Sequence, residues 1–76
     1  MSLDEEIKQI LENFDNTDSA KFLIVLNQIQ EKFQSNLTKD YLNGKIKTIN
    51  ETLNESEKKK LCKNLLPYLD WYLQGL

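Results

Sequence analysis

The sequence predicts an all-α fold: a small bundle of four helices with short connections, in which the last helix is kinked or restarted at Pro67. Apolar residues recur at helical spacing in four successive segments, and no segment alternates between apolar and polar residues over a useful length. A chain of 76 residues has room for one core. We therefore interpret residues 1–76 as a single helical domain.

The first two segments differ in how apolar they are. Residues 2–14 carry apolar side chains on one helical face, and Ser2 with Glu5 has the spacing of a capping box. Residues 18–34 contain an unbroken apolar run, and a helix that is apolar nearly all round is buried nearly all round. We expect this segment to be the central helix. Its main stripe is Phe22, Leu26, Ile29 and Phe33, with Val25 beside it, while Leu23 and Ile24 fall on other sides.

The third segment follows a break at residues 35–38. Thr38 is a good N-cap residue, and Leu37 has the spacing to pack against Leu42 as a hydrophobic staple. The helix that follows should carry one narrow apolar face. That face consists of Leu42, Ile46, Ile49 and Leu53.

The fourth segment opens at Asn54, which forms a second capping box with Glu57. Pro67 cannot donate an amide hydrogen bond, and its ring crowds the carbonyl of Lys63. We expect a first piece to about residue 64 and a second over about 66–74, with Gly75 as its stop. The shared apolar face is Leu61, Leu65, Tyr68, Leu69, Tyr72 and Leu76, with Leu66 and Leu73 widening it.

The composition argues against catalysis. The chain has no histidine, no arginine and one cysteine, Cys62, so the commonest general base and any multi-cysteine or histidine metal site are absent together. We expect no enzyme activity, no cofactor, no metal and no small-molecule substrate. Cys62 lies at the edge of the leucine face without a histidine partner, which predicts a buried, slowly reacting thiol.

The same composition bears on location and assembly. A lone cysteine and the lack of an apolar N-terminal signal segment predict a cytoplasmic protein. The longest apolar run, Phe22 to Leu26, is far short of the roughly 20 residues that span a bilayer, so we expect no membrane association. A core this small is marginal alone. This favours burial against another chain, either a second copy in a homo-oligomer or a different protein.

The C-terminal aromatic residues give the leading functional hypothesis. Tyrosine and tryptophan are enriched at interface hot spots, and the last segment spreads apolar side chains wider than one contact needs. We therefore expect a protein-protein interaction module, of adaptor or inhibitor type. The alternative is that this helix is simply enclosed by the bundle, with Trp71 half-covered by the first segment. The expected binding residues are Tyr68, Trp71, Tyr72 and Leu73.

The lysines carry the alternative function, a small helical regulator that binds RNA or DNA. Residues 39–63 hold seven lysines against four acidic residues, a balance of +3, which is a modest basic footprint. Arginine, the main reader of guanine, is absent. The expected contacts of this alternative are Lys45, Lys47, Lys58, Lys59, Lys60 and Lys63.

Overall fold

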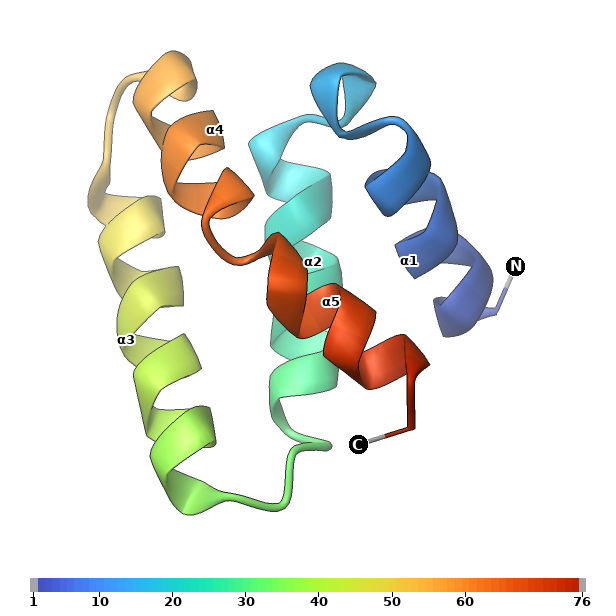
Figure 1. The fold of residues 1–76 in the computed structure, drawn as a ribbon. Helices are drawn as coiled ribbons and strands as arrows, with labels where there is room; N and C mark the ends of the chain where they lie inside the picture. Colours follow the sequence, from blue (N-terminus) through green and yellow to red (C-terminus); the bar gives the residue numbers. More distant parts are fainter. Residues whose placement is uncertain (1, 76) are drawn as a thin grey trace.

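Residues 2–75 are described by a computed structural model (Figure 1). This part of the chain contains five α-helices, one 3-10 turn and no strand. The all-α prediction is confirmed, but the helix count is five rather than four. The elements are α1 (Leu3–Glu12), η1 (Phe14–Asn16), α2 (Ser19–Gln30), α3 (Asn36–Glu51), α4 (Glu55–Lys63) and α5 (Leu66–Leu73).

The additional helix arises because the fourth predicted segment is divided. Helix α4 ends at Lys63 and α5 begins at Leu66, so the predicted restart beside Pro67 is confirmed. Pro67 lies in the first turn of α5, where an amide has no helical partner and its loss costs little. Figure 1 shows α5 leaving the end of α4 and crossing in front of α2 toward α1. The break therefore allows one segment to pack against two different neighbours.

Helix α2 is central, as its apolar run predicts. It contacts all four other α-helices, and Figure 1 shows it between α1 and α3. Ile24 departs from the expectation, since its side chain is 56% exposed while Leu23 is buried. The core of buried apolar residues is Ile7, Ile10, Phe22, Leu23, Val25, Leu26, Ile29, Phe33, Leu42, Ile49, Cys62, Leu65 and Leu69.

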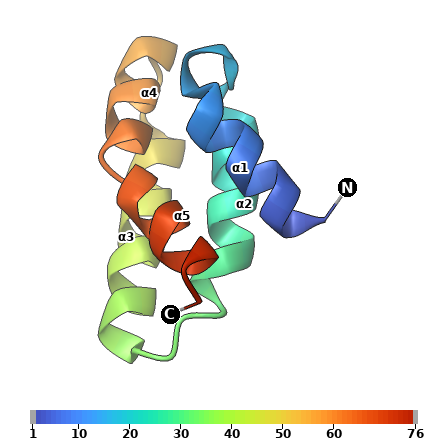
Figure 2. The same cartoon turned by 45° about the vertical axis from the view of Figure 1, so that its right-hand side comes forward.

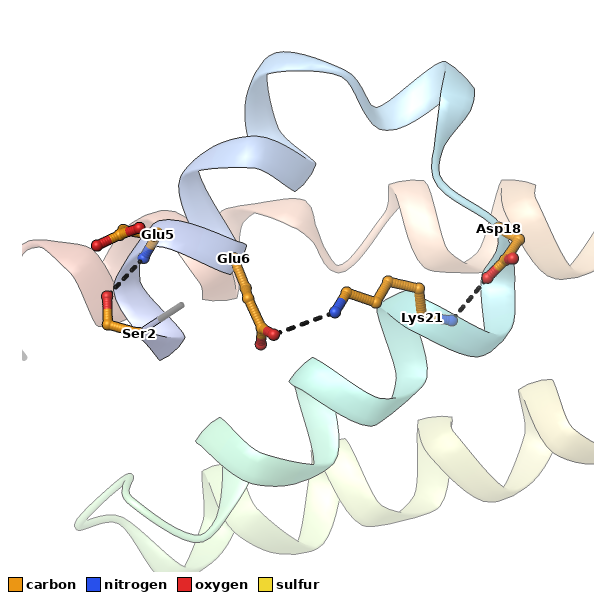
Figure 3. A network of polar contacts seen from close by, with 5 residues as sticks. All are labelled: Ser2, Glu5, Glu6, Asp18 and Lys21. Carbon is orange, nitrogen blue, oxygen red and sulfur yellow. Dashed lines mark hydrogen bonds and ion pairs between the residues drawn. The ribbon is translucent and has the colours of Figure 1, made fainter.

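Side-chain caps begin the first two helices (Figure 3). The Ser2 hydroxyl accepts a hydrogen bond from the Glu5 amide at 3.2 Å, and the Asp18 carboxylate accepts one from the Lys21 amide at 2.8 Å. Each satisfies an amide that has no partner within its helix. Lys21 also pairs with Glu6 at 3.2 Å, which links α2 to α1. The Glu6 carboxylate therefore contributes a contact between the first two helices.

Helix α3 begins earlier than predicted. Ser35 is its N-cap, and its hydroxyl accepts a hydrogen bond from the Thr38 amide at 3.3 Å, so the expectation for Thr38 is wrong. Leu37 then falls within the first turn and is 83% exposed, too open to form the predicted staple. Leu53 is 98% exposed because α3 ends at Glu51, before the apolar stripe does.

The ends of the C-terminal helices follow the prediction. The Asn54 side chain accepts a hydrogen bond from the Glu57 amide at 3.1 Å and caps α4. Gly75 has a φ of 89°, in the left-handed region that favours glycine, and its amide donates to the Tyr72 carbonyl at 3.1 Å. The expected contribution of Leu76 to the apolar face lies outside the described residues.

Helix α4 holds the connection between α1 and α2 in place. The Glu55 carboxylate accepts hydrogen bonds from the Ser19 hydroxyl at 2.7 Å and from the Ser19 amide at 3.1 Å. One turn later, the Lys59 ammonium donates to the carbonyls of Phe14 and Thr17. It also lies 4.0 Å from the centre of the Phe14 ring, a cation–π contact. Two side chains of α4 therefore bind both ends of a connection some 40 residues earlier.

Candidate protein-binding surface

Three of the four residues predicted to bind protein are partly buried in the bundle, and the fourth is half-exposed. Tyr72 and Leu73 are partly buried and pack against the core. Tyr68 is also partly buried, but Trp71 is 50% exposed. Much of the broad apolar face of this segment is therefore covered inside the bundle, because α5 lies against both α1 and α2. Trp71 is its main exposed aromatic residue.

Tyr68 is the centre of an aromatic cluster drawn from three parts of the fold. Its ring lies 6.1 Å from that of Phe33, 6.0 Å from that of Tyr41 and 5.3 Å from that of Trp71, measured between ring centres. The Phe33 and Trp71 rings meet Tyr68 nearly edge-on, a favoured geometry for aromatic pairs. Phe33 is buried, while Tyr41 and Trp71 are each about half-exposed. The cluster thus has a buried base and two open rings.

Trp71 also forms one wall of a shallow hollow. The hollow has a volume of about 220 Å³ and opens to solvent between α5 and the start of α3. The Trp71 ring packs nearly edge-on against Tyr68 and lies beside the start of α3, and its 50% exposure leaves it half-covered. The hollow is lined by Phe33, Gln34, Ser35, Thr38 and Trp71, none of which is charged.

The sequence interpretation missed Tyr41 and Leu37. Both lie on α3, four residues apart, and are 49% and 83% exposed. Residues four apart on a helix are neighbours, so Leu37 extends the apolar surface beyond Tyr41. The spacing of these two residues already indicated their exposure, because Leu37 and Tyr41 lie beside the buried apolar stripe of α3, which includes Leu42, rather than within it. We use the name aromatic surface for the set Leu37, Tyr41, Tyr68 and Trp71.

The aromatic surface is electrically neutral at ordinary pH. Partial burial, and then the neighbouring Tyr41, raise the pKa of Tyr68 above its usual value of 10.0. The phenol of Tyr68 therefore remains protonated and able to donate a hydrogen bond. Lys45 adds a positive charge at the edge, with its ammonium 5.5 Å from the centre of the Tyr41 ring.

The six lysines of the alternative hypothesis do not form one free basic face. The Lys59 ammonium is bound to backbone carbonyls, and that of Lys60 pairs with Glu57 at 3.6 Å on the same helix. Lys45 and Lys47 are two residues apart on α3, which places them roughly 200° apart around its axis. Lys58 and Lys63 also lie on α4, the former partly buried and the latter exposed.

Cys62 is fully buried in the core. Burial raises the pKa of its thiol to about 11, so the reactive thiolate is scarce at neutral pH. Within residues 2–75, acidic and cysteine side chains nowhere gather in a group of three that could hold a metal ion. Among the same residues, each helix falls short of the length and apolar character needed to cross a bilayer.

Comparison with known proteins adds no family assignment. No protein-family model, no curated protein and no solved structure matches the chain.

Proposed function

We propose that this chain is a small, non-enzymatic, cytoplasmic interaction module that binds another protein through the aromatic surface, as an adaptor or an inhibitor. The observation that carries the proposal is the aromatic cluster, in which Tyr68 and Phe33 support the half-exposed rings of Tyr41 and Trp71. Trp71 and Tyr68 are the central binding residues. Tyr72 and Leu73 contribute by fixing α5 on the core.

Physical considerations favour protein as the ligand of this surface. Tryptophan and tyrosine supply large apolar contact areas with few rotatable bonds, so little conformational entropy is lost on binding. The rings are already packed against Tyr68, which reduces that cost further. The uncharged hollow beside Trp71 offers a place for an apolar side chain of the partner, surrounded by hydroxyl and amide groups.

The test is a binding measurement on the Trp71→Ala variant. A partner is first isolated by affinity capture with the wild-type chain, and its dissociation constant is then measured with purified components. Removal of a hot-spot tryptophan typically costs 2 kcal/mol or more, which corresponds to about a 30-fold loss of affinity. Circular dichroism establishes that the variant is folded under the conditions used.

Leu53→Ala is the matched control, because Leu53 is 98% exposed and follows the far end of α3 from Leu37. We expect this variant to bind as wild type does. Equal affinity of the Trp71→Ala and wild-type chains for every captured partner would remove the aromatic surface from the functional account.

The positions of the six lysines give less support to the alternative hypothesis, in which the chain binds RNA or DNA. Binding to nucleic acid needs lysines that are free to reach phosphates, and the ammonium group of Lys59 already binds the carbonyls of Phe14 and Thr17. The two hypotheses differ in salt dependence. Affinity for RNA or DNA falls steeply as salt rises, while an apolar protein interface changes little.

A further inference from the structure

We propose that the partner binds through an acidic peptide segment, whose carboxylate pairs with Lys45 at the edge of the aromatic surface. This inference rests on the proposed function, because it names the chemistry of the partner that the same surface binds. A second hollow, of about 100 Å³, lies between α3 and α4 beside Tyr41. Its lining includes Tyr41, Lys45 and Thr48 of α3 and Leu61, Asn64 and Leu65 at the end of α4 and just beyond it.

The two hollows follow one face of α3. Four exposed side chains recur there at spacings of four, four and three residues, which places them on the same side of the helix. They are Leu37, Tyr41, Lys45 and Thr48. The hollow beside Trp71 reaches α3 at Thr38, and the second hollow reaches it as far as Thr48. A rise of about 1.5 Å per residue puts these two threonines about 15 Å apart along the axis. One peptide segment can therefore enter both hollows and cross the aromatic rings between them.

Lys45 supplies the charge that selects the partner. Its ammonium group is the only charged group among the described residues that line either hollow. It lies 5.5 Å from the centre of the Tyr41 ring, and no carboxylate of residues 2–75 forms an ion pair with it. A partner that covers this hollow removes water from the ammonium group, which costs free energy unless a carboxylate of the partner takes the place of that water. Charge complementarity therefore favours an acidic segment and disfavours a basic one.

The rest of the lining favours a peptide over a ligand that carries phosphates. Nucleic acids are bound through several cations that follow the phosphate backbone, whereas one lysine serves both hollows. The other lining groups are aromatic and aliphatic side chains, with hydroxyl and amide groups between them. Apolar side chains on either side of a carboxylate match this arrangement, because the apolar recesses take the apolar side chains while the hydroxyl and amide groups pair with peptide groups.

Selection from a library of random peptides about 12 residues long tests the proposal, because such a peptide spans the surface even when it is helical. Trp71 is the only tryptophan of the chain, so its fluorescence reports directly on binding at the aromatic surface. We expect the selected peptides to be enriched in aspartate and glutamate beside apolar residues. In the strongest binder, replacement of the acidic residues by the matching amides should weaken binding to the wild-type chain about tenfold.

Lys45→Met and Lys47→Met form a matched pair of variants. Both remove one positive charge and keep the apolar stem, and both positions are exposed on α3. Lys47 lies roughly 200° from Lys45 around the helix axis and does not line the second hollow. Lys45→Met should bind the acidic peptide about tenfold more weakly than wild type and should no longer distinguish it from its amide form. Lys47→Met should keep both the wild-type affinity and the discrimination.

Equal affinities of the two lysine variants for the acidic peptide would overturn the proposal. Selected peptides no more acidic than the library, or a library without any binder detected by Trp71 fluorescence, would do the same. Lys45-dependent binding of single-stranded RNA in place of peptide would also overturn it and would assign Lys45 to the alternative function. The proposed function is tested separately, because Trp71→Ala should lose the captured partner whatever the charge preference. Peptides that bind Trp71→Ala as tightly as wild type would count against the aromatic surface itself.

Discussion

Replacement of Lys59 by methionine tests whether α4 holds the α1–α2 connection in place. Methionine keeps the apolar stem and has a similar helix propensity, so the change removes mainly the ammonium group. The Phe14 carbonyl retains its hydrogen bond from the Thr17 amide, whereas the Thr17 carbonyl loses the lysine donor. Hydrogen bonds to charged groups contribute about 1.5–3 kcal/mol when buried. Partial exposure of Lys59 and rehydration of the Thr17 carbonyl reduce this contribution. We therefore expect the variant to lose about 2 kcal/mol of unfolding free energy.

Urea unfolding followed by circular dichroism measures the effect. A domain of this size has a denaturant dependence of about 1 kcal/mol per molar urea, so the midpoint should fall by about 2 M. Lys60→Met is the matched control on the same helix, because its ammonium is exposed and pairs only weakly with Glu57 at 3.6 Å. It should cost about 0.5 kcal/mol or less. A Lys59→Met midpoint equal to that of Lys60→Met would refute the structural role of Lys59.

Two further predictions concern titration. Hydrogen bonds from the Ser19 hydroxyl and amide lower the pKa of Glu55 below its usual 4.5. The stability that the Glu55 carboxylate contributes is therefore present above pH 4.5 and is lost as the pH falls through the lower pKa of the folded chain. The urea midpoints of wild type and Glu55→Gln should converge in acid, and a constant difference between them down to pH 2 would contradict this role of Glu55. Burial raises the pKa of Cys62 to about 11. At pH 8 a thiol reagent should therefore label the native chain at least about 100-fold more slowly than the urea-unfolded chain. Labelling rates within tenfold of each other would contradict the burial of this thiol.

The sequence predicted helix positions well where periodicity and capping agreed. Asn54 and Pro67 each act locally, through a side-chain cap and a missing amide donor, and both predicted features are observed. The start of α3 was misjudged because residues 35–38 hold two candidate caps, Ser35 and Thr38, and the local pattern does not choose between them. The choice of Ser35 adds a turn to the helix and exposes Leu37.

Long-range contacts set the remaining differences. Lys59 belongs to a run of four lysines within six residues and has no local feature that distinguishes it from Lys60. Lys59 is partly buried because the fold places its ammonium group against the carbonyls of Phe14 and Thr17, which are more than 40 residues earlier in the sequence. The three-dimensional structure was therefore needed to separate the structural lysine, Lys59, from its neighbours.

The aromatic surface illustrates the same limit and also explains the use of the break before Pro67. Its residues come from α3 and from α5, so no single periodic segment contains it. A straight helix through residues 55–73 would follow one line, whereas the observed α5 leaves the line of α4 and crosses α2 (Figure 2). That turn brings Leu69 into the core and Tyr68 against Tyr41. The exposed position of Trp71 is thus a consequence of the break between α4 and α5. The same change in helix direction places Leu69 in the core and Tyr68 in the aromatic surface.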